Sequence, residues 1–172
     1  MNTMERKIST NINHPINEEI AKINDPRTKA ILFFHDQHKE IMSRARGSSK
    51  NHQWWIGGYR DHIYETLIIA RLLYKTMNDF RPLPFLLDSA LIVLYFHDIE
   101  KITKYTTGAE FDKDHFYKEG IKKYQISFTD EELNALTYIH GENQHYSNQK
   151  RTMNELAAFC HCVDTISARI WF

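Results

Sequence analysis

A seven-residue apolar run, residues 90–96, ends directly at the dipeptide His97-Asp98. A run of this kind forms the buried part of a helix or a strand. Ionised groups at its end are costly unless a partner compensates their charge. A divalent metal ion is an economical partner, because neutral imidazole and carboxylate together suit Mn, Fe, Zn or Ni. The dipeptide therefore predicts a buried metal site, with a buried ion pair or a helix C-terminal cap as the alternative.

Length and composition favour one globular domain. The chain has 172 residues, of which 42% are hydrophobic and 26% charged, and it contains neither a low-complexity segment nor an internal repeat. Such a chain is large enough to bury one sizeable core. We expect residues 1–16 to form a mobile, polar N-terminal segment and residues 17–172 to form a single domain.

The charge balance argues against some classes of partner. Lys plus Arg equal Asp plus Glu at 22 each, so the formal net charge is zero. Binding along a nucleic-acid backbone needs a cationic surface, which makes nucleic acid the less favoured partner. No apolar stretch approaches the roughly 18 residues of a membrane span, and the N-terminus lacks a signal-peptide pattern. Cys160 and Cys162 are too close for a comfortable disulfide and fit a reducing compartment, so we expect a cytoplasmic protein without membrane contact.

Each segment with a clear pattern predicts a helix, and no pair of segments carries a hairpin signal, so the expected fold class is all-α. Asp25-Pro26 resembles an N-cap followed by Pro at the first helical position, and residues 129–132 form a capping box. Pro82 and Pro84 interrupt the chain before the apolar run. We expect helices at 17–24, 112–124, 130–140 and 152–170. We also expect a helix that starts at 26 and ends before 47, one that lies between 58 and 81, and one that ends at 97–98.

Three of these helices carry side chains suited to one metal site. A site in the core of a helical bundle requires ligands from several separate helices. Two imidazoles and two carboxylates would bind a divalent cation and leave room for water and substrate, and such a cation lowers the pKa of bound water and polarises a phosphoryl oxygen. The four candidate ligands are His62, His97, Asp98 and Asp164.

The order His…His-Asp…Asp on an all-α chain of this size resembles the HD superfamily of metal-dependent phosphohydrolases. Residues 57–62, Gly-Gly-Tyr-Arg-Asp-His, are similar to the Gly-Gly-x-x-Glu-His entry to the first ligand helix. Residues 97–101, His-Asp-Ile-Glu-Lys, are similar to His-Asp-Ile-Gly-Lys, with Glu100 in place of Gly. Residues 138–142 resemble a His-His-Gly-Glu turn that lacks one His, and residues 159–164 resemble the closing helix. The resemblance spans roughly residues 52–168, the motif-bearing core of an expected HD-type bundle.

The resemblance implies a ligand set for one metal ion, with Asp98 bridging to a second ion in binuclear relatives. The implied cofactor is a divalent metal such as Mn, Fe, Ni, Co or Mg. The first-metal ligands would be His62, His97, Asp98 and Asp164. His115 and His140 fall in the stretches that correspond to those holding the second ion in the binuclear relatives. The alternatives are that His115 is solvated at a polar helix start and that His140 caps its helix beside Gly141.

Further residues are candidates for catalysis or substrate binding. Lys101 matches the motif lysine, whose implied role is to hold a phosphate oxygen beside the metal-bound Asp98. Glu100 or His140 would relay protons. His52 and Trp55 would line the mouth of the pocket, with Trp55 stacking on a base, and Lys118 would guide a polyanionic substrate. Core packing is the alternative for Trp55, and a solvated helix face is the alternative for Lys118.

The resemblance implies an enzyme that cleaves a phosphoester or phosphoanhydride bond of a nucleotide with a metal-activated water. The alternatives are a 3′-to-5′ exonuclease acting on short single strands and a non-catalytic HD-fold interaction module.

Three patterns are not assigned to the metal site. A second His-Asp pair, His35-Asp36, lacks companion ligands and is expected in a surface or second-shell role. On a helix, Cys160 and Cys162 point about 200° apart and cannot share a metal ion. The apolar end, residues 169–172, is expected to dock on the body of the protein or on another subunit.

Overall fold

The computed structural model describes residues 15–171, and this part of the chain is helical and contains no strand. The prediction of an all-α fold is confirmed. Of the expected N-terminal segment, residues 1–14 lie outside the described residues, whereas Ile16 is buried and begins the first helix. The elements are α1 (Ile16–Ala21), α2 (Thr28–Arg44), α3 (Gly58–Phe80), α4 (Leu87–Phe96), α5 (Lys101–Lys104), α6 (Lys113–Lys118), the 3-10 helix η1 (Gly120–Tyr124), α7 (Asp130–Tyr138), the 3-10 helix η2 (Asn143–His145) and α8 (Glu155–Arg169).

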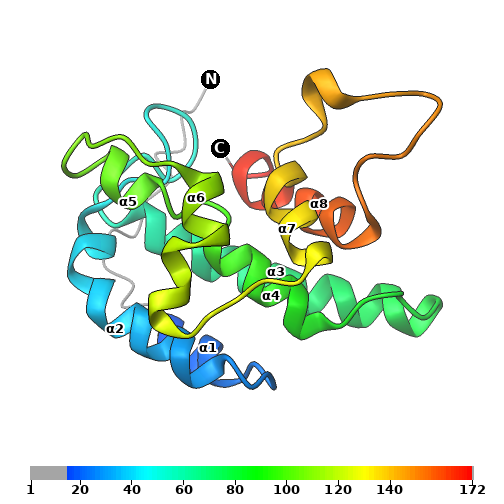
Figure 1. Cartoon of the computed structure of the whole chain (residues 1–172), viewed down its shortest axis with the longest axis horizontal. Helices are drawn as coiled ribbons and strands as arrows, with labels where there is room; N and C mark the ends of the chain where they lie inside the picture. Colours follow the sequence, from blue (N-terminus) through cyan, green and yellow to red (C-terminus); the bar gives the residue numbers. More distant parts are fainter. Residues whose placement is uncertain (1–14, 172) are drawn as a thin grey trace, which may run out of the picture.

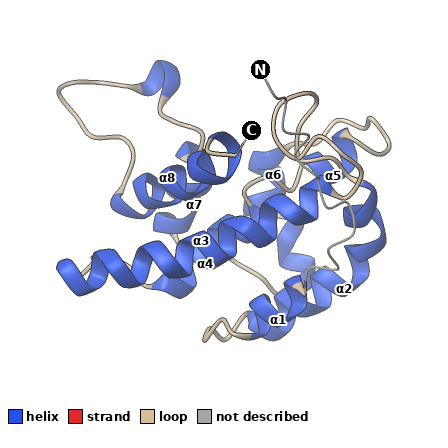
Figure 2. Ribbon diagram, turned by 180° about the vertical axis from the view of Figure 1, so that it is seen from behind, coloured by secondary structure: helices blue, strands red, loops and turns tan. Residues whose placement is uncertain are grey.

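Helix α4 is the centre of the bundle. Its residues 90–96 are all buried, as expected for a helix that is apolar on every side. Helices α3, α7 and α8 pack directly against it. Figures 1 and 2 show α7 and α8 on one side of the α3–α4 pair and α1 and α2 on the other. The C-terminal end of α4 is thereby enclosed by helices from distant parts of the sequence.

The predicted start of α2 is wrong by two residues. The helix begins at Thr28, and the Asp25 carboxylate instead accepts the backbone N–H of Arg27 at 2.8 Å in a turn before the helix. The Arg27 guanidinium donates two hydrogen bonds, of 2.6 and 2.8 Å, to the carboxylate oxygens of the buried Glu132 of α7. Glu132 also closes the predicted capping box with Thr129, which is confirmed. One buried carboxylate therefore joins the start of α2 to the start of α7.

The predicted helices 17–24 and 130–140 are shorter at their C-terminal ends, as Ile16–Ala21 and Asp130–Tyr138, and the predicted helices 112–124 and 152–170 also differ from the observed ones. The segment 112–124 is not one helix, because α6 ends at Lys118 and a 3-10 helix follows from Gly120. Glycine has a low helix propensity, which favours an interruption at this point. The last helix begins at Glu155, later than predicted, because Asn154 caps it by accepting the N–H of Ala157 at 2.7 Å.

The chain ends in exposed apolar residues. Ile170 and Trp171 are 63% and 47% exposed, so these two side chains are not buried against the body of the protein. Phe172 lies outside the described residues, and docking of this end on another subunit stays a prediction. Among residues 15–171, no helix is both long enough and apolar enough to cross a membrane.

In the pair His35-Asp36, His35 lies in the core and Asp36 lies on the surface. Asp36 is exposed and pairs with Lys39. His35 is buried, and its Nδ1 lies 3.0 Å from the hydroxyl of Tyr95 in α4. The expected surface role thus applies to Asp36, whereas His35 is a hydrogen-bonded core residue.

We expect His35 to make the stability of the protein fall between pH 7 and pH 5. Burial lowers the pKa of His35 from 6.5 to about 4. The unfolded chain therefore binds a proton in this range that the folded protein does not, and the stability present above pH 6.5 is lost as the pH falls toward 4. The substitution His35→Gln removes this titration. Urea unfolding at both pH values should show that the wild type loses about 2 kcal/mol more than the variant; equal losses would contradict the assignment.

Candidate metal centre

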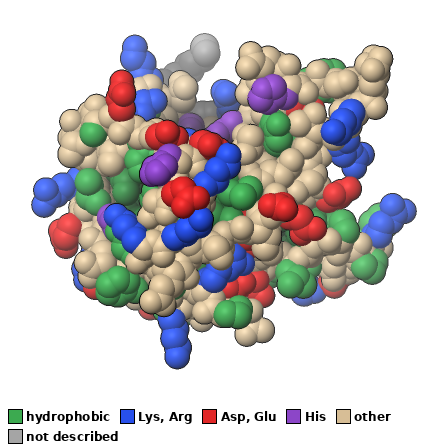
Figure 3. Space-filling view, viewed as in Figure 1, with side chains coloured by type: hydrophobic (Ala, Val, Ile, Leu, Met, Phe, Trp, Pro, Cys, Tyr) green, Lys and Arg blue, Asp and Glu red, His purple; other side chains and the backbone are tan. Residues whose placement is uncertain are grey.

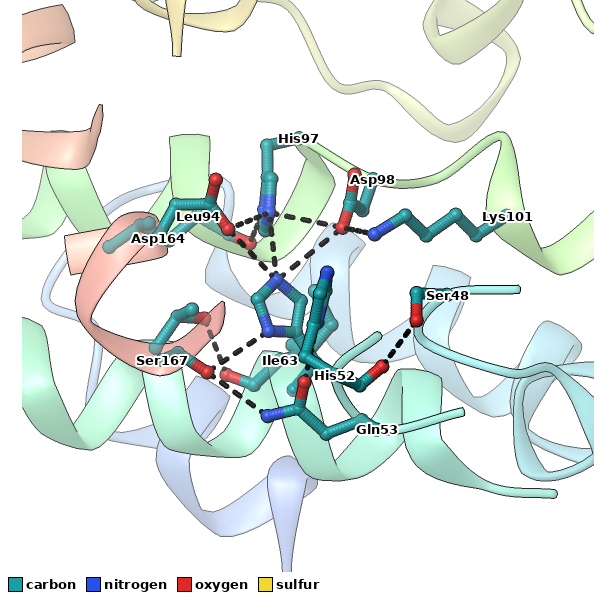
Figure 4. A network of polar contacts seen from close by, with 12 residues as sticks. Ser48, His52, Gln53, Ile63, Leu94, His97, Asp98, Lys101, Asp164 and Ser167 are labelled. Carbon is teal, nitrogen blue, oxygen red and sulfur yellow. Dashed lines mark hydrogen bonds and ion pairs between the residues drawn. The ribbon is translucent and has the colours of Figure 1, made fainter. Parts of the chain in front are cut away.

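The four predicted ligands converge where α4 ends. His62 lies in the second turn of α3, His97 and Asp98 directly follow α4, and Asp164 lies on α8. All four are buried: His62, His97 and Asp98 are 0% exposed and Asp164 is 8% exposed. Figure 4 shows His97, Asp98 and Asp164 pointing toward one another. The packing of α3 and α8 against α4 brings these distant residues together.

The distances between the donor atoms are those of a metal site. Nε2 of His62 lies 3.1 Å from Oδ1 of Asp164 and 3.4 Å from Oδ2 of Asp98. Nε2 of His97 lies 3.3 Å from the same Asp98 oxygen and 3.5 Å from the same Asp164 oxygen. The two Nε2 atoms are 3.2 Å apart. Donors about 2.1 Å from a tetrahedral metal ion lie roughly 3.4 Å from one another, so the residues present fit a divalent cation.

The charges of the centre also fit a cation. Asp98 is fully buried, and neither of its oxygens has a hydrogen bond of ordinary geometry with a described residue. Burial raises the pKa of Asp98, but the positive charges of His97 and Lys101 outweigh this effect and hold the pKa well below its usual range. For Asp164, burial also raises the pKa, and its close contacts with His62 and His97 lower the pKa further than burial raises it. Two ionised carboxylates are thus enclosed in the core.

His97 carries the compensating proton in the metal-free protein. Burial lowers its pKa, but the neighbouring carboxylates Asp98 and Asp164 raise it to about 10. Its Nδ1 is 2.7 Å from the carbonyl oxygen of Leu94, so Nδ1 donates there and Nε2 faces the two carboxylates. A metal ion that binds this nitrogen must displace its proton.

Of the two histidines proposed for a second ion, the structure brings His140 to the centre. Its Nε2 lies 3.5 Å from Oδ1 of Asp98 and 3.8 Å from Oδ2 of Asp164, the oxygens that face away from His62 and His97. Among the described residues, His97, Asp98 and His140 form a second group of suitably spaced ligand atoms. His115 is exposed and belongs to neither group.

The two candidate catalytic residues after Asp98 have different surroundings. The Lys101 side chain is 14% exposed, and its ammonium group pairs with Oδ2 of Asp98. The Glu100 carboxylate lies 3.2 Å from the ammonium group of Lys113. Lys113 also donates a hydrogen bond of 2.7 Å to the carbonyl oxygen of His97. Lys101 is therefore part of the centre, and Glu100 and Lys113 brace the turn that holds it.

The three candidate substrate-binding side chains are spread apart. The ring of His52 is half-buried, and its centroid lies 5.1 Å from that of His62, at the edge of the centre. The indole N–H of Trp55 donates to Asp61 at 2.5 Å. The exposed Lys118 pairs with Asp114 one turn before it. The structure thus places His52 beside the ligands, and Trp55 and Lys118 contact carboxylates outside the ligand groups.

Three polar residues next to the ligands were missed by the sequence interpretation. The hydroxyl oxygen of Ser167 lies 3.0 Å from Nδ1 of His62. Glu65 and Gln53 join this hydroxyl in one partly buried network, of which Figure 4 shows the contact between Gln53 and Ser167. Helical spacing is a signal that could have found two of them, since Ser167 is three residues after Asp164 and Glu65 three after His62.

The two glycines at the start of α3 have separate structural roles. Gly57 has φ of 83°, a conformation that favours glycine. A Cβ on Gly58 would lie 1.8 Å from the carbonyl oxygen of Gln53, so no side chain fits there. The similar Gly-Gly pair in the motif thus coincides with a close approach of the loop 45–57 to α3.

A pocket of about 940 Å³ is lined by residues of the segment 141–154, by residues 83–85 and by part of α8. Cys162 of α8 lines this pocket, and none of the four predicted metal ligands does.

No family model matches this sequence, and no curated protein or solved structure matches it either.

We expect the substitution Asp98→Ala to abolish metal binding. It removes the oxygen shared by His62 and His97, and with it a charge that attracts the cation. Elemental analysis of protein purified without chelator should find about one or two ions per chain in the wild type and close to none in the variant. The matched control is Asp36→Ala in the other His-Asp pair, which should keep the metal. Equal metal content in all three proteins would contradict the assignment of the centre.

The two remaining histidines should differ in their effect on metal affinity. His140→Ala removes a nitrogen close to Asp98 and Asp164, so we expect Mn²⁺ binding to weaken about 10-fold. His115→Ala should leave it unchanged, because His115 lies outside both ligand groups. Calorimetric titration of both variants with Mn²⁺ measures this difference. The reverse order of effects would show that the ligand grouping is wrong.

Proposed function

We propose that this protein is a metal-dependent phosphohydrolase that cleaves a phosphoester or phosphoanhydride bond of a nucleotide. The observation that carries the proposal is the buried cluster of two imidazole nitrogens and two carboxylates, whose atoms are separated by 3.1 to 3.5 Å. Few structural needs explain two ionised carboxylates in the core of a helical bundle, because burying charge is costly without a strong partner. The resemblance to the HD superfamily points to the same chemistry.

The residues around the centre suit attack of water on phosphorus. A divalent ion held by the four candidate ligands would lower the pKa of a bound water and polarise a phosphoryl oxygen. Lys101 would place its ammonium group beside the phosphoryl oxygens and offset the negative charge that develops on them. His140 is 46% exposed beside Asp98 and would accept a proton on the open side of the centre.

A small nucleotide is the preferred substrate class. The phosphate specificity follows from the proposed metal and from Lys101, and the nucleoside part follows from the resemblance alone. On the face drawn in Figure 3, cationic and anionic side chains are interspersed, in keeping with a formal net charge of zero. Binding to a long polyanion favours a continuous cationic surface. A 3′-to-5′ exonuclease on short single strands stays the alternative.

We expect Lys101→Met to lower kcat/KM about 100-fold in the presence of Mn²⁺, because the charge on the phosphoryl oxygens loses its neutralising partner. The matched control is Lys104→Met, which alters an exposed lysine on the same short helix and should keep full activity. The assay is phosphate or nucleoside release from a panel of nucleoside monophosphates, triphosphates and cyclic nucleotides, with short oligonucleotides as the competing class.

The same panel separates the alternatives. Activity confined to oligonucleotides, together with binding that weakens steeply with salt, would replace the proposal with the exonuclease. Metal binding without hydrolysis of any substrate would favour the non-catalytic module. Equal activity of the two lysine variants would exclude the role of Lys101.

A further inference from the structure

The hydrogen-bond network behind His62 fixes the position of its ring proton. Oε2 of Glu65 lies 2.9 Å from the hydroxyl of Ser167; burial raises the pKa of Glu65, and in its ionised form this carboxylate can only accept hydrogen bonds. Serine has a single hydroxyl hydrogen, which is used in this bond. Toward Nδ1 of His62, 3.0 Å away, the hydroxyl oxygen can therefore only accept. His62 must carry a proton on Nδ1, and its Nε2 is the nitrogen left to face the centre.

A second branch of the network acts on His52 in the same way. Nε2 of Gln53 lies 2.6 Å from the same Glu65 oxygen, so the amide group must present its NH₂ side to the carboxylate. The amide oxygen then faces the other way, 2.6 Å from Nδ1 of His52. An amide oxygen can only accept, so His52 also carries its proton on Nδ1. Its Nε2 is left unprotonated beside the ring of His62.

We propose that Glu65 is a positioning residue that, through Ser167 and Gln53, keeps the ring protons of His62 and His52 on Nδ1 and so frees both Nε2 atoms for the centre. Partners of this kind orient metal-binding histidines and raise the affinity for the ion. Here one carboxylate would serve two histidines by two routes. The statement about metal affinity rests on the proposed function, whereas the statement about ring protons does not.

The backbone around Gln53 supports a dedicated role for this side chain. Gln53 is 0% exposed, and its φ of 38° is a left-handed conformation that non-glycine residues rarely adopt. Its carbonyl oxygen accepts the N–H of Gly47 at 2.8 Å and lies against Gly58, where no Cβ fits. The left-handed backbone conformation of Gln53 costs free energy, and it places the amide group between Glu65 and His52.

The first test reads the ring protons directly. Long-range ¹H–¹⁵N correlation spectra of the chelator-treated protein at pH 8 should show Nδ1 protonated in both His52 and His62. In Glu65→Ala the hydroxyl of Ser167 is free to turn toward His62, so we expect Nδ1 of His62 to lose its proton to Nε2. In Ser167→Ala only the His62 signals should change, and those of His52 should stay as in the wild type.

The second test measures Mn²⁺ affinity of the same proteins by calorimetry. We expect Glu65→Ala to weaken binding about 10- to 100-fold. Glu65→Gln keeps an acceptor oxygen, so it should preserve the ring protons and bind with intermediate affinity. The matched control is Asp79→Ala, which removes an exposed, ion-paired carboxylate from the same helix.

The outcomes separate the two proposals. An unprotonated Nδ1 on His62 in the wild type, or unchanged ring protons and affinity in Glu65→Ala, would overturn the role of Glu65. Should Glu65→Ala not fold, Ser167→Ala gives the same comparison for the ring proton of His62. Ring protons as expected in a protein that takes up no Mn²⁺ would support the network and refute the metal centre.

Discussion

The buried carboxylate of Asp98 is the constraint on which the rest of the centre depends. Helix α4 is apolar on all sides and carries this residue into the middle of the bundle. Placing an uncompensated charge there costs several kcal/mol. In the metal-free protein the cost is offset by two cations, the protonated His97 and the Lys101 ammonium group. A divalent ion would replace the proton on His97 and weaken the ion pair between Lys101 and Asp98. Lys101 thus balances the charge of Asp98, and under the proposed function it would become available to a phosphate when an ion is bound.

The same helix was the most predictable part of the chain, and the reason is physical. A continuous apolar run is expected to be buried, as a helix or a strand, and the polar dipeptide His97-Asp98 at its end then needs a partner that compensates its charge. Asp164 was predictable because an unpaired carboxylate among the apolar residues of a helix needs a partner. His62 was predicted from the Gly-Gly motif that precedes it. The capping box at Thr129 was predictable because it depends on four consecutive residues. Signals of this kind are local, and the sequence displays them directly.

The features that escaped prediction are those that depend on contacts between distant segments. The sequence around Gln53 carries no pattern that places an amide against Glu65, because the loop conformation arises from its approach to Gly58. The start of α2 moved to Thr28 because Arg27 is drawn to Glu132, more than one hundred residues later. His35 resembled a surface residue from its neighbours in sequence, and only the position of Tyr95 explains its burial. Local patterns locate ligands, whereas the groups that orient them are set by tertiary packing.

Glu100 stands where the His-Asp-Ile-Gly-Lys pattern has glycine, and its side chain has a partner within the structure. The C-terminal carbonyl groups of a helix lack intrahelical donors and must be satisfied elsewhere. At the end of α4, Lys113 donates to the carbonyl oxygen of His97, and the hydroxyl of Tyr117 donates to that of Phe96. Glu100 pairs with the same Lys113 and so holds the ammonium group over the turn. A carboxylate at this position and a lysine on α6 therefore act as one brace for the His-Asp turn. In this chain the replacement of glycine is an added support of the centre and by itself gives no reason to regard the centre as degraded.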